Sequence, residues 1–242
     1  MKNKLDTHVE AYQGKSIYDF DNEILLNWYP KRIIKLIDDP KNKSLLELGV
    51  GHGFSTNVFS SIFDRHLVLD GSKAVIDNFN SNYPESKAEI VETYFENYAS
   101  EEKFDVIVLG FILEHVDDPC EILSKYRDFL TPNGKMYLAV PNAEVLNRRL
   151  GNLAGMLDDM ESLSSNDVLL GHQRYYTVKT LSDDIQNSGY KIAKIEGIYL
   201  KPLTTKQMTS LNLGIDIITS LCEVGINYPE LSCGILAEVT SS

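Results

Sequence analysis

The sequence contains only three cysteines, Cys120, Cys222 and Cys233, among its 242 residues. An odd number of cysteines at such wide spacings fits neither a disulfide framework nor a cysteine-based metal site. Three reduced thiols that pack as small apolar side chains fit the pattern better. The cysteines therefore favour a reducing compartment, and we expect a cytoplasmic protein.

Basic residues are also few. Lys and Arg number 23 against 35 Asp and Glu, which gives a net charge of −12 at pH 7, and they are scattered along the chain. An extended nucleic-acid surface needs a basic stripe or patch. We therefore expect no nucleic-acid partner.

Long apolar runs are absent as well. No stretch approaches the ~18–20 apolar residues that a membrane-spanning helix needs, and residues 1–15 lack the apolar core of a signal peptide. We expect no membrane partner. Because 43% of the residues are hydrophobic, we expect one substantial α/β core with a small cap and without a second full domain.

What the sequence does have is a glycine-rich segment around which the rest is organised. The segment ELGVGHG at 47–53 follows an apolar strand at 44–46 and opens into a helix that begins at Phe54. A strand, a glycine turn and a helix bring backbone N–H groups close to a ligand, because glycine accepts a positive φ and leaves room for it. The third glycine follows the second by two residues, whereas the dinucleotide fingerprint spaces them by three.

A second apolar strand, at 66–69, ends in Asp70, whose carboxylate could bind both hydroxyls of a ribose. Strands and helices then alternate at short spacing, which predicts a parallel, doubly wound sheet. The further strands are expected at 88–92, 104–110, 135–140, 190–199 and 233–239. Helices are expected from Ser72 to Tyr83, from Pro119 to Leu130 and from Thr180 to Ser188, with one long helix from Lys206 to Val224. A pair of short helices separated at Pro30 is expected within 20–37.

This alternation stops between residues 143 and 177, where the sequence is too polar for a core. We predict an insertion over the carboxyl ends of the strands, where open α/β sheets bind ligands. The chain would then form a single domain with an N-terminal helical cover at 1–43 and a cofactor-binding core at 44–142. A cap over 143–177 and the C-terminal half of the sheet at 178–242 would complete it.

Three motifs in this order resemble the class I S-adenosylmethionine-dependent methyltransferases: ELGVGHG, the strand-terminal Asp70, and LEHVDDP at 113–119. LEHVDDP looks like the segment after the fourth strand in small-molecule enzymes related to the ubiquinone-biosynthesis O-methyltransferases. GHQRYYT at 171–177 is similar to a less specific segment that lies over the active site. The resemblance covers about residues 44–200 and implies a Rossmann-like fold with a mostly parallel, seven-stranded sheet.

The resemblance also implies that S-adenosylmethionine is the cofactor and S-adenosylhomocysteine the product. The glycines would contact the methionine part of the cofactor, and Asp70 with its neighbours would bind the ribose. The aromatic pair after the third strand would line the adenine. The acidic residue often found beside the adenine has no clear counterpart, because Thr93 and Tyr94 stand there. The predicted cofactor-binding residues are Glu47, Gly49, Gly51, Gly53, Asp70, Gly71, Ser72, Tyr94, Phe95, Leu109 and Gly110.

Methyl transfer is an in-line displacement in which the protein mainly aligns the nucleophile and excludes water. A neutral amine could react unaided, whereas a hydroxyl would gain from a base. The candidate catalytic residues are His115, His172 and Tyr176. Each has a plainer alternative: a structural histidine, a solvent-exposed histidine and a packing tyrosine.

The candidate substrate-binding residues are aromatic side chains that could wall a pocket and arginines that could bind a phosphate or a carboxylate. They are Tyr12, Tyr18, Arg148, Arg149, Arg174 and Tyr175. The arginines could equally be surface charges and the tyrosines packing residues.

No metal site is predicted, because no Cys, His or Asp cluster has ligand spacing and Asp117-Asp118 is explained as the cap of a helix at Pro119. The predicted function is methyl transfer from S-adenosylmethionine to an O or N atom of a small polar metabolite, such as a phosphorylated, sugar or amino-acid-like intermediate. A nicotinamide-dependent oxidoreductase and a non-catalytic S-adenosylmethionine-binding module are the alternatives. The helix at 206–224 is a candidate homodimer interface.

Overall fold

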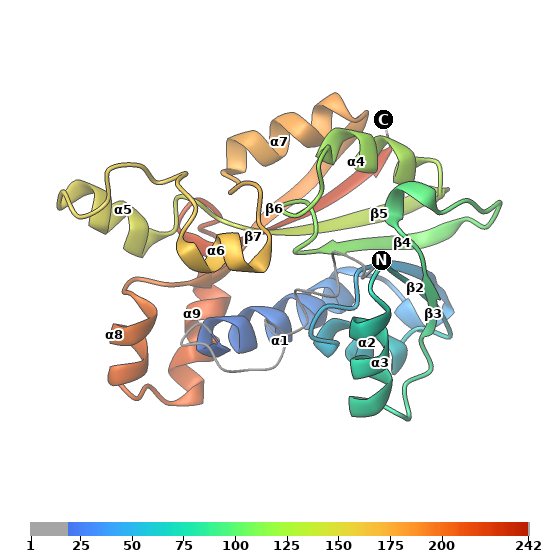
Figure 1. Ribbon diagram of the computed structural model, residues 1–242, viewed down its shortest axis with the longest axis horizontal. Coiled ribbons are helices and arrows are strands. Elements are labelled where there is room, and N and C mark those ends of the chain that lie inside the picture. The colour runs from blue at the N-terminus through green and yellow to red at the C-terminus, as the bar shows by residue number, and fades with distance from the viewer. Residues whose placement is uncertain (1–18, 242) are drawn as a thin grey trace.

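A seven-stranded sheet lies between two layers of helices in the computed structural model, which describes residues 19–241 apart from the side chain of Asn166 (Figure 1). The strand order is β3-β2-β1-β4-β5-β7-β6. β1 to β5 are parallel, and β7 runs antiparallel to both of its neighbours, β5 and β6. The strands are β1 (Ser44–Leu48), β2 (Arg65–Asp70), β3 (Glu89–Glu92), β4 (Phe104–Gly110), β5 (Leu130–Pro141), β6 (Tyr190–Leu200) and β7 (Ser232–Ser241). This sheet confirms the predicted doubly wound α/β fold.

The helices divide between the two faces of the sheet (Figure 1). One face carries α4 (Pro119–Arg127) and α7 (Val178–Asn187). The other carries α1 (Asp19–Leu36), α2 (Phe54–Ser60), α3 (Lys73–Asn82), α8 (Thr205–Ser210) and α9 (Ile215–Gly225). The central strands are buried on both faces, as expected of a parallel sheet, and their apolar side chains form the middle of the core.

Two of the predicted helix starts have the expected caps. The Ser72 side chain accepts a hydrogen bond from the backbone N–H of Val75 at the start of α3. The Asp118 side chain accepts one from the N–H of Glu121, with Pro119 in the first turn of α4. These side chains satisfy N–H groups that have no partner within the helix.

The prediction of two short helices separated at Pro30 is wrong, because α1 continues through this proline. Proline removes one helix hydrogen bond, but Leu25, Tyr29 and Ile33 lie buried on both sides of Pro30. Their burial against the sheet outweighs the local cost. The reverse error occurs at 206–224, where one helix was predicted and two are present. Asn212 adopts a positive φ of 47° between them, which interrupts the helix.

The segment at 143–177 contains α5 (Leu146–Leu153) and α6 (Ser165–Leu170) and lies at the carboxyl ends of the central strands (Figure 1). Its last part returns to the sheet beside β5, where Asn142 and Tyr176 form a parallel bridge. We call residues 143–177 the cap segment. Tyr12 and Tyr18, predicted to face the substrate, lie outside the described residues.

Candidate active site

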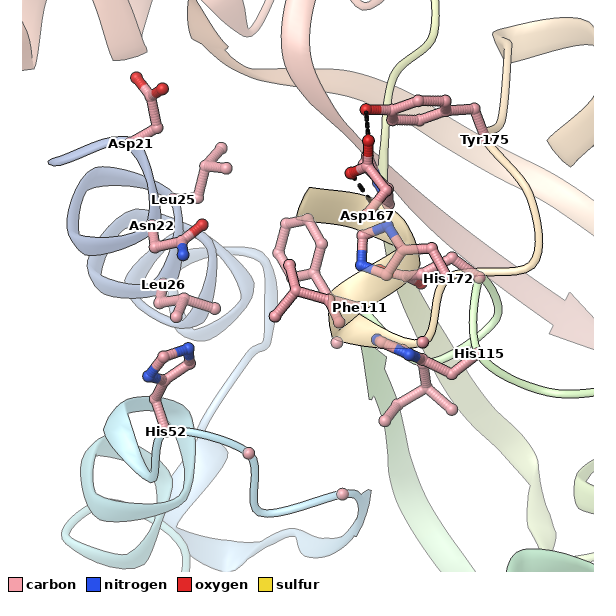
Figure 2. Close-up of a pocket in the computed structure, with 18 of the residues that line it drawn as sticks. Asp21, Asn22, Leu25, Leu26, His52, Phe111, His115, Asp167, His172 and Tyr175 are labelled. Carbon is pink, nitrogen blue, oxygen red and sulfur yellow. Dashed lines mark hydrogen bonds and ion pairs between the residues drawn. The ribbon is translucent and has the colours of Figure 1, made fainter. Parts of the chain in front are cut away.

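A cavity of about 1170 Å³ opens at the carboxyl ends of β1 and β4, beneath the cap segment. Figure 2 shows Asp21 and Leu25 of α1 on one side of it, and His115 and His172 on the other. Single small-molecule sites usually occupy about 300–1,000 Å³. The cavity is therefore large enough for a cofactor and a second small molecule side by side.

The glycine turn forms one end of this cavity. Gly49, Gly51 and Gly53 all have positive φ, at 81°, 52° and 80°. Their surroundings differ. A Cβ on Gly49 would meet the Ile112 side chain at 2.5 Å, and one on Gly53 would meet Phe79 at 2.6 Å, whereas one on Gly51 would have no atom within 4 Å among the described residues. The first and third glycines thus permit close packing of protein on protein, and the second leaves the backbone open to a ligand.

Gly51 offers a test of this difference. We expect Gly51→Ala to weaken S-adenosylmethionine binding about fivefold, because the left-handed conformation and the new methyl group together cost about 1 kcal/mol. The control is Gly53→Ala, which should instead lower the melting temperature through its clash with Phe79. Calorimetric titration and thermal unfolding of both variants measure the two effects. A Gly51 variant that binds as wild type would contradict the placement of the ligand at this turn.

Asp70 connects the glycine turn to the loop before α3. Its two carboxylate oxygens accept hydrogen bonds from the backbone N–H groups of Val50, at 2.9 Å, and of Ser72, at 2.8 Å. Asp70, Gly71 and Ser72 all line the cavity. This position fits the ribose-binding role predicted for Asp70.

Glu47 does not line the cavity. Its side chain is buried behind the turn, where it accepts a hydrogen bond from the Ser55 hydroxyl at 2.6 Å and lies 3.0 Å from Nε2 of His66. These contacts tie β1 to the first turn of α2 and to β2. The sequence assigned no role to His66, whose partner on the neighbouring strand only the sheet register brings close.

The groups predicted for the adenine also lie at the cavity. Tyr94 and Phe95 line it, and so does Glu96, an acidic side chain that the sequence analysis did not consider for this role. Gly110 lines it too, whereas Leu109, which was also predicted to bind the cofactor, is fully buried in the sheet and does not line the cavity. A Cβ on Gly110 would lie 2.3 Å from the Tyr29 hydroxyl, which explains the glycine at this strand end.

Two sequence motifs that are far apart along the chain hold one another. The backbone N–H of Gln173 donates to the carbonyl of Glu114, and its side chain donates to the carbonyl of His115. The Arg174 guanidinium donates to carbonyls of the same loop, those of Leu113, Val116 and Asp117. LEHVDDP and GHQRYYT therefore form a single unit, with a histidine from each motif at the cavity.

The rings of His115 and His172 meet edge to face, with centroids 4.7 Å apart. Nδ1 of His172 lies 3.3 Å from the Asp167 carboxylate, close enough for an ion pair but without hydrogen-bond alignment. Burial alone would raise the pKa of Asp167, but its contacts with His172, Ser164 and Tyr175 outweigh it and hold the pKa well below its usual range. A charged carboxylate beside one imidazole nitrogen prepares the other to accept a proton.

Glu114 completes this group and was not predicted. Its side chain is 1% exposed, and burial raises its pKa to about 7 against the opposing charges of His172 and Arg174. Glu114, His115 and His172 each place a potential ligand atom within 4.8 Å of the others. The prediction of no metal site relied on spacing along the chain, which could not reveal a group assembled from two loops.

The three arginines are not free to bind an anion in the way predicted. Arg148 lines the cavity, but its guanidinium lies over the Tyr175 ring and donates to the backbone carbonyls of Ala143, Met160 and Ser162. Arg149 pairs with Glu144 and Arg174 binds the loop carbonyls, and neither lines the cavity. Their donors stabilise the cap segment and the loop after β4.

The two neighbouring tyrosines have different positions. Tyr175 lines the cavity and donates its hydroxyl to Asp167 at 2.7 Å. Tyr176 points the other way into the core, where it is 1% exposed and donates to Asp184 of α7 at 3.1 Å. The structure thus corrects the catalytic assignment of Tyr176, because a side chain on the far side of the strand cannot reach the cavity.

Three further residues at the cavity were missed by the sequence analysis: Asp21, Asn147 and Lys201. They come from α1, from α5 and from the segment after β6, so no local motif joins them. The ammonium group of Lys201 pairs with Asp21 at 2.5 Å and donates to the Thr205 hydroxyl at 2.8 Å. A buried ion pair between distant segments leaves no pattern in the sequence.

Comparisons with known proteins agree with this geometry. A family model described as a methyltransferase domain matches residues 25–195. A ubiquinone biosynthesis O-methyltransferase of Acinetobacter baumannii (strain SDF) is 19% identical over 211 residues, which cover 85% of this chain and 86% of the relative. None of the helices in the described part of the chain has the length and apolar character needed to span a membrane.

Solved structures show the same fold. An S-adenosylmethionine-dependent methyltransferase from Mesorhizobium loti superposes with a TM-score of 0.61 at 15% identity, covering 88% of this chain and 97% of its own. A possible histamine N-methyltransferase from Thermotoga maritima has a TM-score of 0.63 at 12% identity, and the match covers 98% of this chain and 97% of the other. At such low identity these similarities concern the fold.

Proposed function

Because the chain belongs to the methyltransferase domain family, we propose that it transfers a methyl group from S-adenosylmethionine to an oxygen or nitrogen atom of a small polar metabolite. Family membership makes S-adenosylmethionine the methyl donor and excludes the nicotinamide-dependent alternative. The nature of the methyl acceptor is the proposal.

The observation that carries the proposal is the continuity of the cavity. It extends from the glycine turn and Asp70 to polar side chains of α1, α5 and the segment after β6, among them Asp21, Asn147 and Lys201. A substrate bound among these groups would lie beside the cofactor in the same enclosure. Their polarity favours a hydrophilic molecule over a long apolar one.

The residues of the chain have three tasks in such a reaction. The glycine turn and Asp70 hold the donor, whose bound form supplies an electrophilic methyl group on a sulfonium. The cap segment encloses the cavity and keeps water from competing with the nucleophile. His172, whose Nδ1 lies beside the Asp167 carboxylate, can accept a proton from a hydroxyl or amine nucleophile as the new bond to carbon forms.

A methyl-transfer assay on the full chain tests the proposal, with release of S-adenosylhomocysteine as the measurement. The panel should contain amines, sugars, phosphates and quinone precursors, since the curated relatives are named for ubiquinone biosynthesis. We expect turnover with a polar member of the panel, which would also exclude a non-catalytic binding module. Turnover confined to the quinone precursors would contradict a small polar metabolite.

A further inference from the structure

Some charged and polar groups at the substrate end of the cavity already have hydrogen-bond or ion-pair partners within the protein, and others do not. Two of the cations are occupied: Lys201 is bound by Asp21 and Thr205, and Arg148 by backbone carbonyls. Lys206 also lines the cavity, and its side chain is exposed. Three buried oxygens are not. Within the described part of the chain, no donor reaches one carboxylate oxygen of Asp21, one of Glu114, or the side-chain oxygen of Asn147.

These three oxygens are all hydrogen-bond acceptors, and all belong to residues that line the same cavity. They come from α1, from the loop after β4 and from α5. The residues Asp21 and Glu114 are 4% and 1% exposed, so bulk water solvates them poorly. Buried acceptors without donors are unfavourable in folded proteins and mark places where another molecule completes the hydrogen bonding.

We propose that the substrate is a hydrophilic amine, whose ammonium group binds at Glu114 and whose other N–H or O–H donors meet Asp21 and Asn147. This inference rests on the proposed function, because it names the substrate class for the same cavity. It replaces the anionic substrate that the arginines had suggested. An anion would find Lys201 and Arg148 occupied, with only the exposed Lys206 left among the described Lys and Arg side chains that line the cavity, and it would face three unpartnered acceptor oxygens.

The electrostatics of the cavity support a cation. Asp167 stays ionised beside His172, and among the described residues Asp21 forms an ion pair with Lys201 alone. Glu114 lacks an ion-pair partner within the described residues, and the Arg174 guanidinium near it is directed to backbone carbonyls. An ammonium group would offset the burial of the Glu114 carboxylate and favour its ionised form.

The experiment compares molecules that share a skeleton and differ in charge. Glucosamine, glucose and glucuronate form one set, and putrescine, 1,4-butanediol and succinate form another. Each is titrated calorimetrically into the full chain saturated with S-adenosylhomocysteine. We expect the amine to bind at least tenfold more tightly than the neutral member in at least one set, and the carboxylate not to bind. The proposal is overturned if neither amine binds, or if the carboxylates bind more tightly.

Variants locate the binding. We expect Glu114→Gln to weaken binding of the amine at least tenfold while the affinity for S-adenosylhomocysteine changes less than twofold. The matched control is Glu121→Gln, which removes the same charge from an exposed position on α4 and should bind as wild type. Should Glu114→Gln not fold, Asn147→Asp adds a carboxylate to the cavity and should tighten amine binding. Equal binding by wild type and the variants would overturn the proposal.

A metal at Glu114, His115 and His172 is the competing explanation for the unpartnered carboxylate. The titrations are therefore repeated after EDTA treatment, with and without added Mn²⁺ or Zn²⁺. We expect amine binding to survive the chelator. Loss with EDTA and recovery with the ion would assign the group to a metal and overturn the proposal. Failure of the proposed function is distinct, because amine binding would then persist without methylation of any panel member.

Discussion

Replacing Asp70 with alanine is expected to weaken S-adenosylmethionine binding by about 1–3 kcal/mol, or about tenfold to more than a hundredfold in the dissociation constant. The carboxylate lies at the cavity, where it can accept the ribose hydroxyls with charge-assisted hydrogen bonds. It also fixes the N–H groups of Val50 and Ser72. The substitution therefore removes a ligand contact and loosens the turn that presents the glycines.

Isothermal titration calorimetry on a folded variant measures this effect, with thermal unfolding as the check on folding. Asp77→Ala is the matched control, because it removes an exposed carboxylate of α3 that pairs with Lys73 outside the cavity. We expect the control to bind the cofactor as wild type. An unchanged dissociation constant for the Asp70 variant would remove the ribose-binding assignment.

Replacing His172 with alanine is expected to lower turnover about tenfold or more. General acid–base groups usually contribute about 100-fold to 10,000-fold, so a tenfold loss would lie below the usual range. The side chain lies at the cavity beside His115, and its Nδ1 is 3.3 Å from the Asp167 carboxylate. Its position in the cap segment, apart from the glycine turn, implies that cofactor affinity changes little. Steady-state kinetics on an identified substrate and calorimetry with S-adenosylmethionine separate the two quantities.

Tyr176→Phe is the control for this experiment. It removes a hydroxyl from the same segment, but one that is buried and bonded to Asp184. We expect its turnover to stay near that of wild type. The free energy of unfolding should fall by about 1 kcal/mol for the lost hydrogen bond, which thermal unfolding would show as a lower melting temperature. A His172 variant with wild-type turnover would show that the cap segment supplies no proton acceptor.

Local patterns in the sequence were sufficient to predict the fold and to place the glycine turn and Asp70 at the cavity. The apolar runs at 44–46, 66–69 and 104–110 predicted parallel strands. Gly51 and Asp70 follow two of these strands, and both line the cavity. Such features can be predicted because each depends on neighbours in sequence. A strand end, a positive φ and a helix cap are set within a few residues.

The continuity of α1 through Pro30 could not be predicted in this way, because burial of flanking residues against a distant sheet decides it. The same holds for Tyr175 and Tyr176, adjacent residues that the strand geometry sends to opposite sides, one to the cavity and one to the core.

The substrate half of the site was decided only by tertiary structure. The partners of the cap-segment arginines are backbone carbonyls, which the sequence does not display, and these contacts change candidate anion-binding groups into structural ones. Asp21, Glu114 and Asn147 come from elements far apart along the chain and meet at one cavity because the sheet and the cap bring them there. The sequence by itself placed the glycine turn and Asp70 at strand ends, and both line the cavity, because each is set by its neighbours along the chain. Packing of α1 and the cap segment on the sheet decided which polar groups of the cavity have partners among the described residues and which do not.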